Sequence, residues 1–152
     1  RSHCDWSSDV CSSDLPNPFI IKIKVKETDI DELGHANNKA YLDWSMEAAW
    51  KHSEALGLKP EDYITMDCAM VARRHELNYL VPTFEGDQLI VCTWIINNDG
   101  KYRSRREYQI FRKKDNKTVF RGATDWVCIR LKDGKLYPMP KEFIEAYQPT
   151  NM

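Results

Sequence analysis

The segment from Asp29 to Leu42 groups carboxylates, a turn glycine, a histidine and two asparagines. These residues are Asp29, Asp31, Gly34, His35, Asn37 and Asn38. The segment lies between a strand-like run and a long helical pattern, so the groups gather at a helix N-terminus. Such an end presents unpaired backbone N–H groups and the positive pole of the helix dipole. A carboxylate beside these donors suits attack on a carbonyl, because the N–H groups can hold the oxyanion that develops.

The hydrophobic pattern indicates the elements that position these groups. Residues 19–26 alternate apolar and basic side chains after Ile20, which predicts a strand with one solvated face. Residues 38–56 predict a long helix that a sheet covers, with Asn37 or Asn38 as its N-cap and Gly57 just beyond its C-terminus. The polar stripe of this helix consists of Asp43, Glu47, Lys51 and Glu54.

After a polar loop that contains Pro60, the remaining pattern predicts strands. They are expected at 68–80, 88–98, 102–113 and 118–131, with Gly, Asn and Asp at the turns between them. A short helix is expected after Pro140. One strand, a long helix and four further strands define an α+β fold, and one sheet curled around the helix is the simplest packing.

The overall composition is that of one ordinary globular domain. The chain has 152 residues and a net charge of −1, which gives no indication of a nucleic-acid or membrane partner. No apolar run approaches the roughly 18 residues of a membrane-spanning helix. The five cysteines include no CxxC pair, and Cys68, Cys92 and Cys128 lie in apolar strand-like runs. This pattern predicts buried free thiols in a reducing compartment, with the cytoplasm as the expected location.

Residues 1–15 differ from the rest of the chain. They are rich in Ser and Asp, nearly repeat Ser-Ser-Asp, and lack the basic start and apolar centre of a signal peptide. They resemble translated sequencing-adaptor fragments, and we expect either a non-native or a natural disordered tail. Removing one arginine and three aspartates with this segment leaves 21 basic and 20 acidic residues. The expected domain, residues 16–152, is therefore essentially neutral.

Several kinds of site are excluded because their motifs are missing. The chain has no GxSxG elbow, no glycine-rich phosphate loop, no HExxH and no paired-cysteine metal site. Asp29-x-Asp31-x-x-Gly34 begins like a calcium loop. Leu33 and Ala40 occupy the fifth and twelfth positions, where oxygen ligands are required, so we reject a calcium site.

The order of elements and the motif together resemble the hotdog-fold acyl-CoA thioesterases, specifically the 4-hydroxybenzoyl-CoA thioesterase-like branch. The resemblance runs from about Phe19 to Pro140. The motifs that carry it are Asp29-x-Asp31-x-x-Gly34-His35-x-Asn37-Asn38-x-x-Tyr41-Leu42, Glu47-Ala48, Asn78-Tyr79-x-x-Pro82, Gly86-Asp87 and Val127-Cys128-Ile129. The resemblance implies a curled antiparallel sheet around one long central helix. It also implies hydrolysis of acyl-CoA thioesters without metal or other cofactor, in a homodimer or homotetramer with sites at the subunit interface.

The resemblance also implies roles for individual residues. Asp31 would be the nucleophile or the general base, and the backbone N–H of Asn38 would polarise the thioester oxygen. A thioester is already activated, so the residues leave both roles of Asp31 open. His35 would orient Asp31, shape the loop or transfer a proton. The expected substrate-binding residues at this end are Gly34, Asn37 and Tyr41, with Tyr41 as a pocket wall.

A basic cluster provides a second candidate site. Arg103 and Arg105 are expected to share one face of a strand, with Arg106 on the other face. In the resembling enzymes, residues near this point bind the phosphates of CoA, and guanidinium groups suit phosphate well. A solvated sheet face is the competing interpretation, and Arg73 and Arg74 form a second basic pair.

Two other functions remain open at this point. A hotdog dehydratase or hydratase would need an acid/base pair with a characteristic intervening proline, and no proline lies between Asp31 and His35. A non-catalytic acyl-CoA sensor or scaffold would not need Asp31 beside the helix start, so the presence of this aspartate argues against it.

Overall fold

The computed structural model describes residues 4–5, 9–11 and 17–149, so most of the expected tail at 1–15 lies outside the described residues. Within that segment, the short strands β1 (Cys4–Asp5) and β2 (Asp9–Cys11) pair with each other and belong to no larger sheet. The expectation that residues 1–15 are a tail outside a 16–152 domain stays a prediction.

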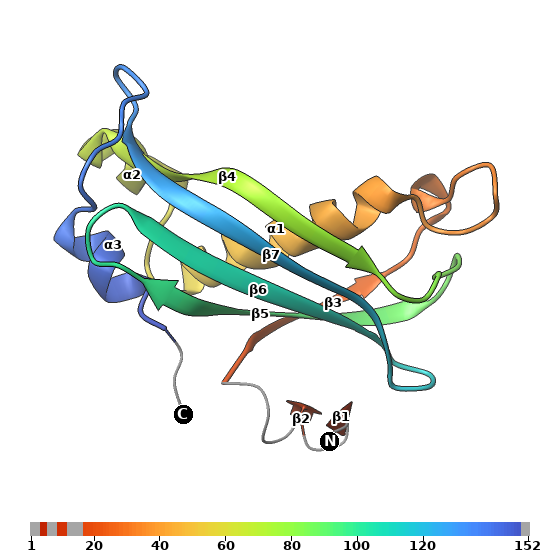
Figure 1. Cartoon of the computed structure of the whole chain (residues 1–152). Helices are drawn as coiled ribbons and strands as arrows, with labels where there is room; N and C mark the ends of the chain where they lie inside the picture. Colours follow the sequence, from red (N-terminus) through yellow and green to blue (C-terminus); the bar gives the residue numbers. More distant parts are fainter. Residues whose placement is uncertain (1–3, 6–8, 12–16, 150–152) are drawn as a thin grey trace.

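A five-stranded antiparallel sheet forms the body of the molecule (Figure 1). Its strands are β3 (Phe19–Lys24), β4 (Cys68–Tyr79), β5 (Gln88–Asn98), β6 (Arg103–Arg112) and β7 (Lys117–Arg130). Their order across the sheet is β3-β5-β6-β7-β4, and every neighbouring pair is antiparallel. The expected strands and the α+β class are confirmed, and β3 and β4 are the two edges.

The 18-residue helix α1 (Asn38–Ala55) lies along one face of this sheet (Figure 1). It packs against β5 and β3, where Ala40, Trp44 and Ala48 are buried in one cluster with residues of the inner strands. The helix ends as the sequence predicts. Gly57 has a φ of +96°, and the N–H groups of Gly57 and Leu58 donate to the last helical carbonyls, which closes a Schellman cap.

Two short helices cover one end of the molecule beyond α1. The helix α3 (Lys141–Ala146) follows Pro140 as expected, whereas α2 (Pro60–Met66) replaces the predicted polar loop. Pro60 is the first helical residue, and the Asp62 carboxylate accepts the N–H of Lys59 at 2.8 Å, so this segment carries helix-start residues. Burial of Tyr63 then anchors α2 against α3.

The core surrounding these elements includes three buried cysteines, Cys68, Cys92 and Cys128, as expected for the apolar runs that contain them. In the described part of the chain, no helix is both long and apolar enough to cross a membrane.

Candidate active site

Asp31 lies in a tight loop directly before α1. An isolated antiparallel bridge joins Ile30 to Ala36 and closes the loop. Inside it, the N–H of Asp31 donates to the carbonyl of His35, and the N–H of Gly34 donates to the carbonyl of Asp31, both at 3.0 Å. Gly34 has a φ of +88°, a conformation that favours glycine. The backbone therefore fixes where the Asp31 side chain begins.

The Asp31 carboxylate is half-buried and has one hydrogen bond from the loop itself. The N–H of Leu33 donates to Oδ1 at 2.9 Å. The side chain keeps 27% of its surface exposed, so its remaining lone pairs can reach a substrate or a water molecule. A carboxylate with a fixed position and lone pairs that accept no hydrogen bond can act on a thioester carbon or on water.

Asn37 ties the start of α1 to the chain just before Asp31. It is the N-cap, and its Oδ1 accepts the N–H of Ala40 at 3.0 Å. On the other side, its Nδ2 and its backbone N–H both donate to the carbonyl of Asp29, at 3.0 and 2.8 Å. Asn37 thus clamps the helix end and the Asp31 loop together.

The first turn of α1 offers backbone donors beside this clamp. The N–H groups of Asn38 and Lys39 have no hydrogen-bond acceptor within the described residues, as expected for the first helical positions. The Asn38 side chain is exposed, and the backbone carbonyl of Asn38 accepts a hydrogen bond from the Tyr79 hydroxyl at 3.3 Å. The backbone of Asn38, rather than its side chain, is therefore suited to hold an oxyanion.

The imidazole of His35 lies close to the Asp31 carboxylate, but the two side chains are not hydrogen-bonded to each other. The His35 Nδ1 is 3.9 Å from Asp31 Oδ1, beyond hydrogen-bond distance. The ring meets Phe84 edge-on, with 6.2 Å between ring centroids. This contact can hold the imidazole near the carboxylate, and proton transfer by His35 stays a prediction.

Thr83 links the Asp31 loop to the buried side chain of Tyr41. The carbonyl of Thr83 accepts the N–H of Ala36 at 2.8 Å, and its hydroxyl bonds to the Tyr41 hydroxyl at 2.9 Å. Tyr41 is 3% exposed and stacks on Phe120, and its burial raises the pKa of the phenol. Tyr41 is therefore a core residue, and its expected role as a pocket wall stays a prediction.

Thr83 and Arg112 were not expected at the site from the sequence. Arg112 is buried, donates to the carbonyl of Pro82 at 3.0 Å, and makes a paired contact with the Asp115 carboxylate. It thereby fixes the residue that precedes Thr83. In the sequence, the one signal for this contact is that Thr83 directly follows the Asn78-Tyr79-x-x-Pro82 motif.

The arginines expected to bind CoA lie far from Asp31 in this chain. Arg112, at the end of β6, adjoins the Asp31 loop through Pro82, whereas Arg103 begins the strand. Nine residue steps along β6 place Arg103 about 30 Å from Arg112. Arg103 is exposed, whereas Arg105 pairs with Asp125 at 2.9 Å and with Glu76 at 3.1 Å, and these pairs raise its pKa. The predicted alternation of faces is confirmed, and a phosphate role stays a prediction.

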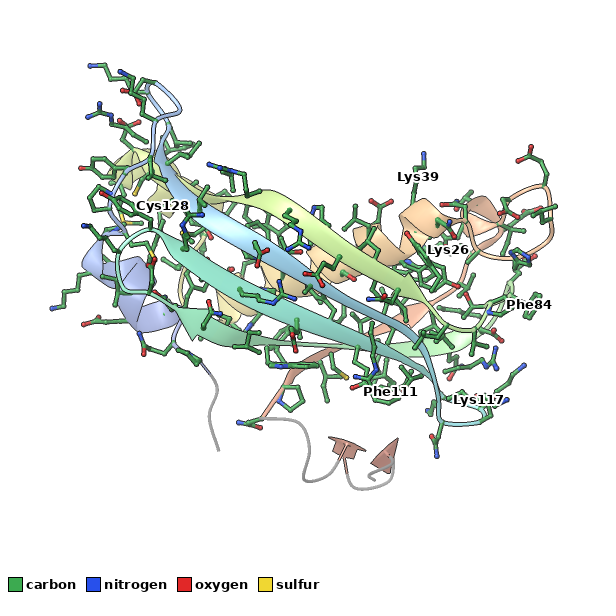
Figure 2. The ribbon with its side chains drawn as sticks, viewed as in Figure 1. Lys26, Lys39, Phe84, Phe111, Lys117 and Cys128 are labelled. Atoms are coloured by element: carbon green, nitrogen blue, oxygen red, sulfur yellow. The ribbon has the colours of Figure 1, made fainter. Side chains whose placement is uncertain are left out.

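Figure 2 shows the separation of the two ends of the molecule. Lys39 and Phe84 mark the end with the Asp31 loop, and Cys128 lies at the end with α2 and α3.

Among the described residues, no cluster of three or more His, Cys, Asp or Glu side chains could hold a metal ion.

Comparison with known proteins identifies the family. The sequence pattern of the Thioesterase-like superfamily matches residues 25–147, so the chain belongs to this family, and its class is thioester hydrolase. The expected family is thereby confirmed. No curated protein sequence gives a significant match.

Solved structures show the same fold. A 1,4-dihydroxy-2-naphthoyl-CoA thioesterase from Synechocystis has 23% identity and a TM-score of 0.78, with 86% of this chain and 96% of that chain covered. YbaW of Escherichia coli, described as a probable thioesterase, has 25% identity and a TM-score of 0.73 over 88% and 99%. A hypothetical protein from Staphylococcus aureus in complex with CoA has 16% identity and a TM-score of 0.80 over 93% and 92%.

Proposed function

We propose that this protein hydrolyses acyl-CoA thioesters to the free carboxylic acid and CoA. Asp31 acts as nucleophile or general base, and the N–H of Asn38 at the start of α1 receives the oxyanion. The observation that carries this proposal is the clamp by Asn37, which holds the Asp31 loop and the helix N-terminus in one unit. The superfamily match and the solved acyl-CoA thioesterase from Synechocystis support the substrate class.

Two chemical routes use the same residues. As a base, Asp31 takes a proton from water while the water oxygen bonds to the thioester carbon. As a nucleophile, its carboxylate forms the bond itself and expels CoA thiolate, and water then hydrolyses the mixed anhydride. In both routes negative charge develops on the thioester oxygen, where the helix N–H groups and the helix dipole stabilise it. In both routes the C–S bond breaks, and the CoA thiolate becomes the thiol by taking up the proton that the water loses.

Release of free thiol tests the activity directly. Purified protein should release CoA thiol from some members of a panel of acyl-CoAs that varies chain length and includes aromatic acyl groups. Acyl-N-acetylcysteamine thioesters, which lack the nucleotide, should react with a higher KM. Absence of thiol release from every acyl-CoA would refute hydrolysis and favour a non-catalytic acyl-CoA binder.

We also propose that the active form is a homodimer or homotetramer. Large apolar side chains are exposed around the site. They are Leu33 (78% exposed), Leu80 (51%), Phe84 (45%) and Tyr79 (42%). The long strand β4 also leaves an edge that no strand covers in the described residues. A second copy would cover both features, since apolar surface and strand edges favour association.

Sedimentation should therefore show a dimer or larger species at micromolar concentration. A strictly monomeric and fully active enzyme would contradict the proposed assembly.

Within each subunit, we propose that the sheet curls around α1 as in a hotdog fold. We also propose a reducing, cytoplasmic location, because the cysteines in the apolar strands are buried.

A further inference from the structure

Arg106 is a buried arginine without a carboxylate partner in the described part of the chain. It lies on β6 with its side chain 3% exposed, and its Nη1 contacts the Nδ1 of His52 at 2.9 Å and the hydroxyl of Thr93 at 3.0 Å. No Asp or Glu oxygen of the described residues lies within 4.0 Å of it, whereas its neighbour Arg105 has several. A buried cation is costly unless an anion accompanies it.

The groups around Arg106 do not supply that negative charge. Burial, and then the charge of Arg106, lowers the pKa of His52 to about 4, so His52 is a neutral hydrogen-bond acceptor. Tyr63 and Tyr147 lie near the guanidinium, and burial raises the pKa of Tyr63, so this phenol stays neutral. An arginine side chain stays protonated in a protein. The charge of Arg106 is therefore uncompensated in the described structure.

An apolar cavity of about 200 Å³ adjoins Arg106. Its walls come from α1, β4 and β5, and they include Ala49, Trp50, Met70, Val71 and Ile95. At the Arg106 side, the hydroxyls of Ser53 and Tyr63 both bond to the Tyr147 hydroxyl, at 2.9 and 3.1 Å. The cavity thus has a hydrocarbon body and one polar, cationic end.

The cavity is accessible and lies apart from the Asp31 loop. Trp50 lines it and is 52% exposed, so the cavity reaches the surface beside this ring. Ala49 lies eleven residues beyond the start of α1, which corresponds to about 16 Å along the helix. A dry cavity of ~150 Å³ is known to bind benzene, so this volume holds a ring or a short alkyl chain.

We infer that this cavity binds a carboxylic acid with a small apolar body, whose carboxylate pairs with Arg106 while the body fills the space between α1 and β4. The charge-assisted contact supplies the missing anion, and a guanidinium can hold a carboxylate through two N–H groups. Trp126 also lines the cavity, but its indole nitrogen is covered and lies near the Tyr108 hydroxyl, so Arg106 is the group that recognises the carboxylate.

Two sources provide this chemistry. One is a free acid such as benzoate or hexanoate, and the other is an acyl-CoA whose acyl group ends in a second carboxylate. Binding of the free acid does not depend on hydrolysis at Asp31, so failure of the proposed activity and failure of this site are separate results.

Calorimetry and thermal denaturation of the full-length protein test the site. Benzoate and hexanoate should bind and raise the melting temperature, whereas benzyl alcohol and hexanol of similar shape should not. Arg106→Met should weaken carboxylate binding by roughly tenfold or more, because it removes the charge and keeps the bulk. Arg121→Met removes an exposed arginine on β7 and is the matched control, which should bind as wild type does.

A second variant and a second substrate pair cover the other outcomes. Ala49→Leu keeps Arg106 but fills the cavity, so it should also abolish binding, even if Arg106→Met does not fold. If free acids do not bind, adipoyl-CoA and hexanoyl-CoA should be compared. A loss confined to adipoyl-CoA in Arg106→Met would support the site with a dicarboxylic acyl group as its ligand. Equal binding of acids and alcohols, with no selective loss for adipoyl-CoA, would overturn the inference.

Discussion

Replacing Asn37 by alanine should both destabilise the protein and slow thioester hydrolysis. The side chain makes two bonds that alanine cannot make. Its Oδ1 caps the N–H of Ala40, and its Nδ2 holds the carbonyl of Asp29. A helix N-cap contributes about 1 kcal/mol and a further hydrogen bond about 1 kcal/mol, so Asn37→Ala should lower the free energy of unfolding by about 2 kcal/mol. Urea denaturation measures this change.

Asn37→Asp separates the two bonds. The aspartate keeps an acceptor for the N–H of Ala40 and adds a negative charge at the helix start, which is favourable there. It lacks the donor to the Asp29 carbonyl. The aspartate variant should therefore lose about half as much stability as the alanine variant.

Hydrolysis rates of the same variants show whether the clamp matters for function. Because Asn37 joins the Asp31 loop to the helix end, Asn37→Ala should lower kcat more than it raises KM at a temperature where it is folded. An alanine variant with unchanged stability and unchanged kcat would refute the reasoning, since the clamp would then hold nothing.

Three further predictions concern other parts of the chain. His52→Asn should flatten the dependence of stability on pH between 6.5 and about 4. In this window the unfolded state binds the proton first, so wild type loses up to about 1.4 kcal/mol per pH unit as pH falls, and parallel curves from urea denaturation would contradict this. Deleting residues 1–15 should leave melting temperature and hydrolysis rate unchanged, and a large drop in either would place them in the fold. Arg103→Ala should raise the KM for acyl-CoA several-fold with kcat nearly preserved, since phosphate contacts lie far from the reacting bond. An equal loss on acyl-N-acetylcysteamine thioesters would assign Arg103 a structural role.

The sequence predicts most elements of the fold because their local patterns agree with the tertiary packing. The alternation in β3 predicts a strand, the polar stripe of α1 predicts a helix, and Gly57 predicts where this helix ends; the structure has each of these features. The helix α2 was missed because seven residues are too few for a clear periodicity. Its helix-start residues, Pro60 and Asp62, are equally common in turns.

Burial and pairing of charged residues could not be predicted from sequence. The prediction put Arg105 and Arg106 on opposite faces but did not indicate which face a helix covers. The structure gives Arg105 carboxylate partners from β4 and β7, distant in sequence, and gives Arg106 a buried position beside His52. Tyr41 likewise follows the motif, yet its ring is stacked in the core because β7 places Phe120 against it.

The central claim is that Asp31 performs the chemistry at the helix start. Asp31→Asn preserves the shape and the acceptor for the N–H of Leu33 but removes the charge that attacks or deprotonates. Glu32→Gln is the matched control, because Glu32 is the adjacent, exposed carboxylate of the same loop, and its side chain takes no part in the hydrogen bonds described for the loop and the clamp.

The most direct measurement is steady-state release of CoA thiol by wild type, Asp31→Asn and Glu32→Gln with the best acyl-CoA of the panel. The proposed mechanism predicts a loss of roughly 10²-fold or more in kcat for Asp31→Asn, a much smaller change in KM, and near wild-type values for Glu32→Gln. Turnover by Asp31→Asn at the wild-type rate would contradict the mechanism.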